Sequence, residues 1–125
     1  MIETAPEKQN SEPYDLEDRT FAFAERVRAF VKKLPKSTAN IEDGKQLIRA
    51  SGSVGSNYIE ANESLSKKDF IMRIKICRKE AKESRYWLRL VDTYDESELE
   101  MDRKYLVKEA TELMNIFGAI LAKSK

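Results

Sequence analysis

Five cations repeat along one side of the segment from Ser66 to Tyr94. Alternating intervals of three and four residues place them on one side of an α-helix, as a basic stripe (Lys75, Arg78, Lys82, Arg85 and Arg89). Such a row can bind nucleic-acid phosphates through Coulomb attraction alone. The alternatives are a solvated helix flank, or partners for acids on a neighbouring helix or subunit. The basic stripe is therefore the first candidate site, as a nucleic-acid-binding surface.

The sequence offers little for catalysis. It contains no histidine and one cysteine, Cys77. The lack of histidine removes the commonest general base, the Ser–His and Cys–His nucleophile pairs and most zinc sites. Glu60, Glu80 and Glu83 suggest a carboxylate metal site, but di-iron bundles combine glutamate with histidine. We therefore predict no catalytic residue, no metal and no cofactor, and a protein that is not an enzyme.

A second candidate site is a polar pair, Asn57 and Glu60, whose spacing of three residues places both on one helix face. They could contact a ligand or nucleic acid. They could also be a buried pair that fixes helix register, together with Arg49 or a basic residue of the next helix. A buried glutamate needs such a partner, because an unpaired charge costs several kcal/mol. We favour the structural role.

Four helices are predicted to position these residues, over 16–34, 40–63, 66–94 and from 97 towards the C-terminus. The boundary signals are N-cap Asp15, helix-ending Pro35 and two capping boxes (Ser66 with Asp69, Ser97 with Glu100). The third helix carries an apolar seam at 4-3 spacing (Phe70, Ile74, Cys77, Ala81, Ser84, Leu88 and Val91). A cysteine on such a seam is expected to be a buried hydrophobe.

Glycines count against the second helix, since each costs about 1 kcal/mol relative to alanine. An apolar period nevertheless continues through them (Leu47, Ser51, Val54, Tyr58 and Ala61). We therefore predict an unbroken helix, in which the small side chains from Ser51 to Ser56 let a neighbouring helix come close. The rival is a helix break whose amides cradle a phosphate. No strand precedes the run and the phosphate-loop spacing is absent.

The last helix is apolar over more than one side. Its seam (Leu99, Leu106, Ala110, Leu113, Phe117 and Ile120) is accompanied by other apolar residues (Met101, Tyr105, Met114, Ile116 and Leu121). This width indicates either an oligomer interface or a broader core stripe. Short links between four helices predict an all-α, antiparallel up-down-up-down bundle over residues 15–125, with residues 1–14 as a disordered tail.

Composition and charge indicate in which cellular compartment the protein is expected. The net charge of +1 does not suggest a general polyanion binder. No apolar run approaches a membrane span, and the N-terminus lacks a basic region followed by an apolar one. A single cysteine gives no sign of an oxidising compartment. We expect a cytoplasmic protein with no membrane association.

The sequence resembles the small bacterial four-helix bundle proteins of the 23S ribosomal RNA intervening-sequence family. The similarity runs from about Arg19 to Val91 and is most specific in segments 46–50, 53–61 and 69–88. A Ser-Val-x-x-Asn-x-x-Glu pattern from Ser53 to Glu60 is its most distinctive part. Asn57 and Glu60 fall on the family's polar signature, for which the family offers no agreed catalytic role.

This resemblance implies a homopentameric ring, and most members of the family have no assigned activity. A related branch serves as the accessory protein of diversity-generating retroelements, where a pentamer with a basic surface engages a reverse transcriptase and nucleic acid. We therefore predict a homo-oligomer, a pentamer, that acts as a binding or scaffold protein. Its expected partners are copies of itself, RNA or DNA, and a reverse transcriptase. The alternative is a purely structural assembly protein that binds no nucleic acid.

Overall fold

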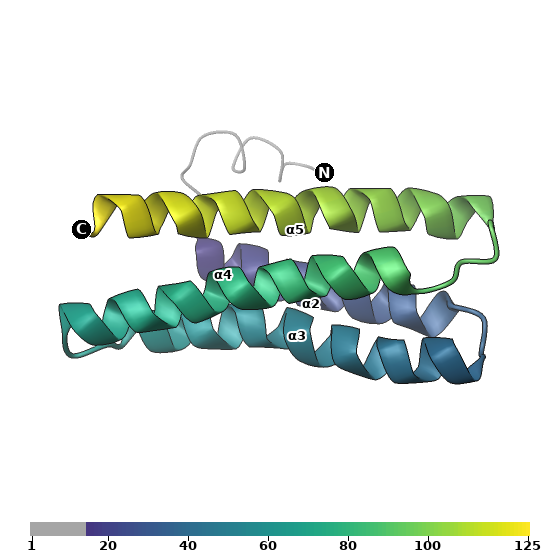
Figure 1. The fold of residues 1–125 in the computed structure, drawn as a ribbon, viewed down its shortest axis with the longest axis horizontal. Helices are drawn as coiled ribbons and strands as arrows, with labels where there is room; N and C mark the ends of the chain where they lie inside the picture. Colours follow the sequence, from purple (N-terminus) through teal and green to yellow (C-terminus); the bar gives the residue numbers. More distant parts are fainter. Residues whose placement is uncertain (1–14) are drawn as a thin grey trace, which may run out of the picture.

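The computed structural model describes residues 15–125, so the predicted tail of residues 1–14 lies outside the described residues. Residues 15–125 form four helices: α2 (Leu16–Lys33), α3 (Thr38–Asn62), α4 (Lys67–Leu90) and α5 (Ser97–Lys123). Consecutive helices run in opposite directions and pack against each other, and α2 also packs against α5 (Figure 1). The predicted all-α, up-down-up-down bundle is therefore confirmed.

Side-chain caps define where the first three helices begin. The Asp15 carboxylate and the Ser66 hydroxyl each accept a hydrogen bond from a backbone N–H of the following turn, as predicted. Helix α3 begins two residues earlier than predicted, because Ser37 caps it and accepts a hydrogen bond from the Asn40 N–H at 3.1 Å. Asn40 is buried instead, and its amide bonds to the backbone of Asp92 at the end of α4.

Helix α4 ends at Leu90, four residues before the predicted end at Tyr94. The Arg103 guanidinium of α5 donates hydrogen bonds to the last carbonyls of this segment, those of Leu88, Arg89 and Val91, at 3.2, 3.3 and 2.6 Å. A side chain from the next helix thus satisfies groups that would otherwise continue the helical ladder. Tyr94 and Asp95 in the link then take φ values of 57° and 59°, in the left-handed region.

The predicted capping box at the start of α5 is wrong by one residue. Glu96 is the N-cap and accepts a hydrogen bond from the Leu99 N–H at 3.0 Å, and Ser97 is the first helical residue. Glu100 cannot complete a capping box, because its carboxylate is bound by the Thr93 hydroxyl and the Arg103 guanidinium. The hydrogen bond from the Thr93 hydroxyl has the larger effect on the pKa of Glu100 and the hydrogen bond from Arg103 the next largest, and both lower it. The cluster therefore contributes to stability at neutral pH, and this contribution is lost as the pH falls through the lowered pKa.

Arg103→Ala should destabilise the α4–α5 link more than the rest of the bundle. The substitution leaves the terminal carbonyls of α4 without their donor, and hydrogen bonds from a charged donor contribute about 1.5–3 kcal/mol each. We expect faster amide exchange in the last turn of α4, measured by hydrogen–deuterium exchange. Lys104→Ala, which removes the neighbouring exposed cation, is the control and should leave this exchange unchanged. Equal exchange in both variants would contradict the capping role of Arg103.

The core contains the predicted seams. Every seam residue of α4 is buried except Phe70, which is partly buried and packs against the core. Helix α3 runs without a break from Ser51 to Ser56, which contradicts the rival phosphate loop. Gly55 is needed there, because a Cβ atom at this position would lie 2.8 Å from Thr20 Oγ1 of α2. Small residues thus allow α2 and α3 to pack closely, as predicted.

Four of the five extra apolar residues of α5 divide into two groups, and the fifth, Ile116, is half-buried. Met114 and Leu121 pack against the core, so the core stripe is broader than a single seam. Met101 and Tyr105 remain 71% and 47% exposed. The Arg26 guanidinium of α2 lies over the Tyr105 ring, 4.2 Å from its centroid, and so covers part of that ring.

Candidate nucleic-acid interface

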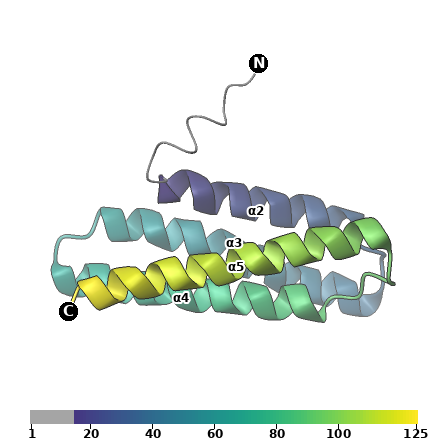
Figure 2. The same cartoon turned by 90° about the horizontal axis from the view of Figure 1, so that it is seen from above.

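The basic stripe lies on the side of α4 that borders α5. Arg85 donates a hydrogen bond to the Thr111 hydroxyl of α5 at 3.1 Å. The Arg78 guanidinium approaches Gly118 of α5, where an added Cβ would meet Arg78 Nη1 at 3.7 Å. These two contacts place the stripe along the junction of α4 and α5, which Figure 2 shows side by side.

The cations of this stripe are accessible and have no acidic partner among residues 15–125. Lys75, Arg78, Lys82 and Arg89 are exposed, and Arg85 is half-buried. None of the ion pairs between described residues includes a member of the stripe. Among residues 15–125, the stripe is therefore not neutralised by acids of a neighbouring helix, which was one of the alternatives.

Four of the five acids of α5 face α2, and the fifth, Glu100, lies at the junction with α4. Lys33 of α2 pairs with Glu98 and Asp102 at 3.4 and 3.2 Å. Arg19 of α2 pairs with Glu109 at 2.7 Å and Glu112 at 2.9 Å. Glu109, by hydrogen bonding, raises the pKa of Arg19, and Asp102 does the same for Lys33. The bundle thus separates most of its charges: ion pairs lie between α2 and α5, and cations lie between α4 and α5, where the one acid, Glu100, is paired with Arg103.

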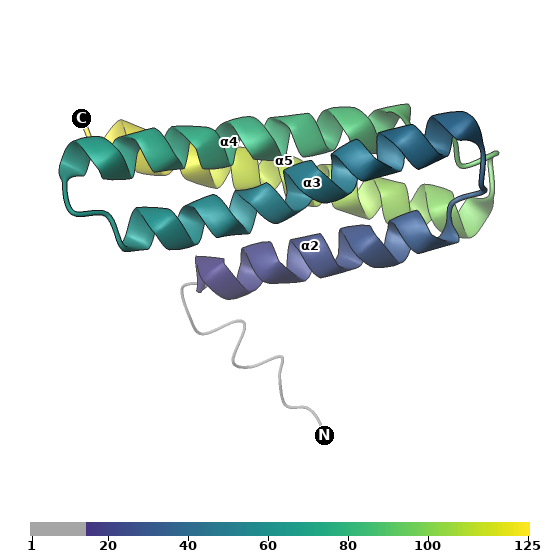
Figure 3. The same cartoon turned by 90° about the horizontal axis from the view of Figure 1, so that it is seen from below.

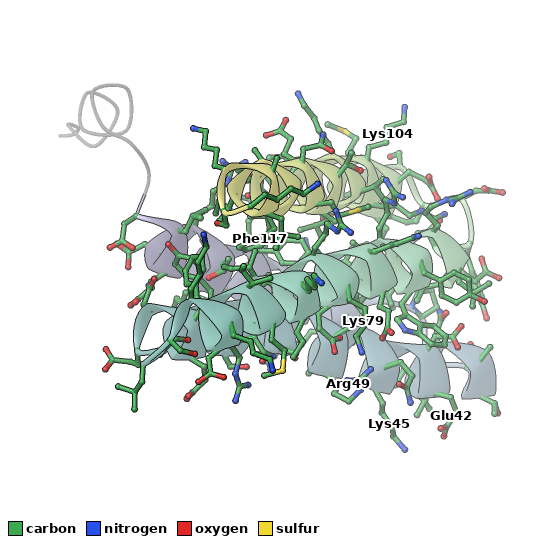
Figure 4. The ribbon with its side chains drawn as sticks, turned by 60° about the vertical axis from the view of Figure 1, so that its left-hand side comes forward. Glu42, Lys45, Arg49, Lys79, Lys104 and Phe117 are labelled. Carbon is green, nitrogen blue, oxygen red and sulfur yellow. The ribbon has the colours of Figure 1, made fainter. Side chains whose placement is uncertain are left out.

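Two lysines of α5 extend the basic stripe across the junction. A shallow depression of about 400 Å³ lies between the end of α4 and the start of α5 and has six lining residues (Arg89, Glu100, Arg103, Lys104, Val107 and Lys108). Its single carboxylate, Glu100, is already paired with Arg103. Lys104 points away from the core in Figure 4. We call the stripe together with Lys104 and Lys108 the basic face; sequence reasoning missed these two lysines, although they are one helical turn apart.

The second candidate site is only partly assembled. Asn57 lies between α3 and α4, where its Oδ1 accepts a hydrogen bond from Arg73 at 2.9 Å and its amide donates to Ser53. It joins the two helices, in the manner expected of a register-setting residue. Glu60 is exposed, so the expected buried pair does not form. Arg49, its anticipated partner, lies beside Glu80 and Glu83 at 3.8 and 3.3 Å.

Glu80 is the buried glutamate of this bundle. It is 6% exposed, and its Oε1 has no hydrogen-bond partner among the described residues. Arg49 of α3 and Lys79 of α4 supply compensating charge at 3.8 and 3.9 Å, and Figure 4 shows these two cations near each other. Within residues 15–125, no group of three potential ligands among histidine, cysteine, aspartate and glutamate could hold a metal ion.

Cys77 is buried in the core, and burial raises the pKa of its thiol to about 12. The thiol is therefore protonated at neutral pH and is a poor nucleophile.

Trp87 is half-buried at the edge of the core and meets Tyr86 edge-on, with ring centroids 5.0 Å apart. Tyr86 itself is 57% exposed. None of the four described helices is long and apolar enough to cross a membrane.

Comparisons with known proteins agree with this architecture. A crystal structure from Bacteroides thetaiotaomicron, of a protein of unknown function from the S23 ribosomal protein family, is similar with a TM-score of 0.73 and 30% sequence identity, over 84% of this chain and 96% of that one. No curated protein matches the sequence. The family model for the 23S rRNA-intervening sequence protein matches residues 13–119. The chain therefore belongs to the 23S rRNA-intervening sequence protein family, for which no function is established.

Proposed function

We propose that this protein is a non-enzymatic, homo-oligomeric scaffold, a pentamer, that binds nucleic acid through its basic face. The observation that supports this most directly is the accessibility of the five stripe cations, which have no acidic partner among residues 15–125. Lys104 and Lys108 widen the same surface. A row of accessible cations is what attraction to a phosphate backbone requires.

The purely structural alternative requires acids of a neighbouring subunit to neutralise this row. The exposed acids without an ion pair among residues 15–125 are dispersed over four places: the start and middle of α2 (Asp15, Glu17, Asp18 and Glu25), the end of α3 (Glu60 and Glu63), the first turn of α4 (Asp69) and the α4–α5 link (Asp92, Asp95 and Glu96). They do not form a row that matches the basic stripe. Phosphates, which repeat regularly along a strand, match it better.

Assembly would add avidity to a modest patch. A ring of identical subunits presents several basic faces to one strand, and linked sites bind far more tightly than one site alone. Such a scaffold could hold nucleic acid for an enzyme that acts on it, and a reverse transcriptase is the partner class that the family resemblance suggests. The Tyr86 ring is exposed on α4 but lies outside the basic face, so stacking on bases is not part of this proposal.

Binding to nucleic acid should depend steeply on salt. If five phosphates are neutralised, log K should fall against log salt with a slope of about −3 to −5, since each contact contributes about −0.7 for single strands and −0.9 for duplexes. Fluorescence anisotropy with labelled RNA and DNA, single-stranded and duplex, measures this between about 50 and 200 mM salt. A chain that binds none of these at low salt would support the purely structural alternative.

A further inference from the structure

The cations of the basic face are unevenly distributed along the junction of α4 and α5. The contacts of Arg85 with Thr111 and of Arg78 with Gly118 fix which parts of the two helices lie opposite each other. Helix α5 contains no lysine or arginine from 109 to 122, so along most of this junction the cations come from α4 alone. Cations of both helices meet near the α4–α5 link, which Figure 3 shows at the end of the bundle opposite the C-terminus.

The meeting point is the shallow depression of about 400 Å³ between the end of α4 and the start of α5. Arg89 lines it from α4, and Lys104 and Lys108 line it from α5. These three residues are exposed and form no ion pair among residues 15–125. The fourth lining cation, Arg103, neutralises the one lining carboxylate, that of Glu100. The depression therefore has a surplus of three positive charges, and we call it the basic depression.

The end of α4 does not weaken this concentration of charge. Carbonyl groups at the C-terminal end of a helix carry partial negative charge and repel an anion. Here the Arg103 guanidinium donates hydrogen bonds to the carbonyls of Leu88 and Val91, at 3.2 and 2.6 Å. A cation held in place by these bonds thus offsets the negative end of the helix dipole beside the basic depression.

We propose that the basic depression binds a terminal phosphate monoester of a nucleic-acid strand, whose following phosphates lie along the basic stripe. A phosphate monoester carries a charge of about −1.5 to −2 at pH 7 and has three acceptor oxygens, whereas each phosphodiester inside a strand carries one charge. Cations from two helices suit the monoester, and a single row of cations suits the diesters. The inference rests on the proposed function and deepens it by naming the part of the nucleic acid that the depression holds.

The lining of the basic depression favours a strand end over a free nucleotide. Pockets for small molecules are mostly apolar and bury most of the ligand. Val107 is the one apolar residue among the six described residues that line this depression, and none of the six is aromatic, so a base has nothing to stack on. A single nucleotide would be held by its phosphate alone. A strand gains further contacts, because the stripe continues from Arg89 to Lys75 over about 21 Å at 1.5 Å per helical residue.

Fluorescence anisotropy with three internally labelled single strands of one sequence tests this inference. One strand ends in a 5′-phosphate, one ends in a 3′-phosphate, and one has hydroxyl groups at both ends. At 0.1 M salt at least one phosphorylated strand should bind about 5-fold more tightly than the hydroxyl-ended strand, because one additional ionic contact contributes about this factor. A hydroxyl-ended strand that is two nucleotides longer carries about the same added charge in its diesters and should lack this gain.

Two double variants locate the gain. Lys104→Ala with Lys108→Ala should bind phosphorylated and hydroxyl-ended strands equally, because the α5 side of the basic depression is lost. Lys75→Ala with Arg78→Ala removes the same charge from the far end of the stripe, and it should weaken binding of both strands and keep the gain. All four side chains are exposed, so both variants should fold, which circular dichroism establishes. A gain that survives the loss of Lys104 and Lys108 would overturn the assignment of the site.

The remaining outcomes separate this inference from the proposed function. Strands that bind with equal affinity whatever their ends would overturn the terminal-phosphate site and leave nucleic-acid binding intact. Adenosine 5′-monophosphate that competes with the phosphorylated strand at micromolar concentration would overturn the strand end in favour of a free nucleotide. A chain that binds none of the strands would overturn both the inference and the proposed function.

Discussion

Replacing Lys75, Arg78 and Lys82 together with alanine should weaken nucleic-acid binding by about 100- to 500-fold at 0.1 M salt. The estimate follows from counterion release, because each lost phosphate contact removes a factor of about 5 for single strands and about 8 for duplexes at this concentration. The salt slope should become shallower by about 2 to 3 for the same reason. Fluorescence anisotropy over a salt series measures both quantities. Since these side chains are exposed, the thermal midpoint should change little.

The matched control removes the same charge elsewhere. Lys32, Lys36 and Lys123 are exposed, lie outside the basic face and form no ion pair within residues 15–125. Their triple alanine variant has the same net charge as the stripe variant, so any effect of overall charge is equal. We expect its salt slope to match that of the unsubstituted chain. Equal losses in both variants would show that net charge, and not the stripe, determines binding.

Local sequence signals predicted the fold where a residue and its neighbours decide the structure. Asp15 and Ser66 cap helices as expected, because an N-cap needs only a side-chain acceptor and the next turn. The end of α4 could not be predicted in this way, since Arg103 of the next helix supplies its cap. Glu100 was assigned to a capping box, but contacts with Thr93 and Arg103 take its carboxylate.

The position of the basic stripe could be predicted from the spacing of its residues in the sequence. The absence of acidic partners for its cations could not be predicted in this way. That absence depends on which neighbour the acids of α5 face, and Glu98, Asp102 and Glu109 lie at helical spacing on the side towards α2. This spacing was a readable signal for the separation of charge. Glu60 was expected to be buried with Asn57 because the two are three residues apart, but three residues fall about 60° short of a full helical turn, and this rotation places Glu60 on the exposed side.

Phe117→Ala should be among the most destabilising single substitutions in the core. Phe117 is fully buried in α5, inside the bundle in Figure 4, and its ring lies 5.9 Å from that of Tyr58 in α3. Truncation removes apolar contacts and leaves a cavity that the surrounding helices cannot fill, which costs about 3–5 kcal/mol. For a domain of this size the thermal midpoint should fall by about 10–20 °C.

Met101→Ala is the matched control on the same helix. Met101 is also a large apolar side chain of α5, but it is 71% exposed. Its truncation should change the free energy of unfolding by less than about 0.5 kcal/mol. Urea unfolding followed by circular dichroism compares the variants at one fixed protein concentration, because an assembly couples stability to concentration. If Phe117→Ala cost no more than Met101→Ala, the Phe117 side chain would not be packed in the core of the bundle as described.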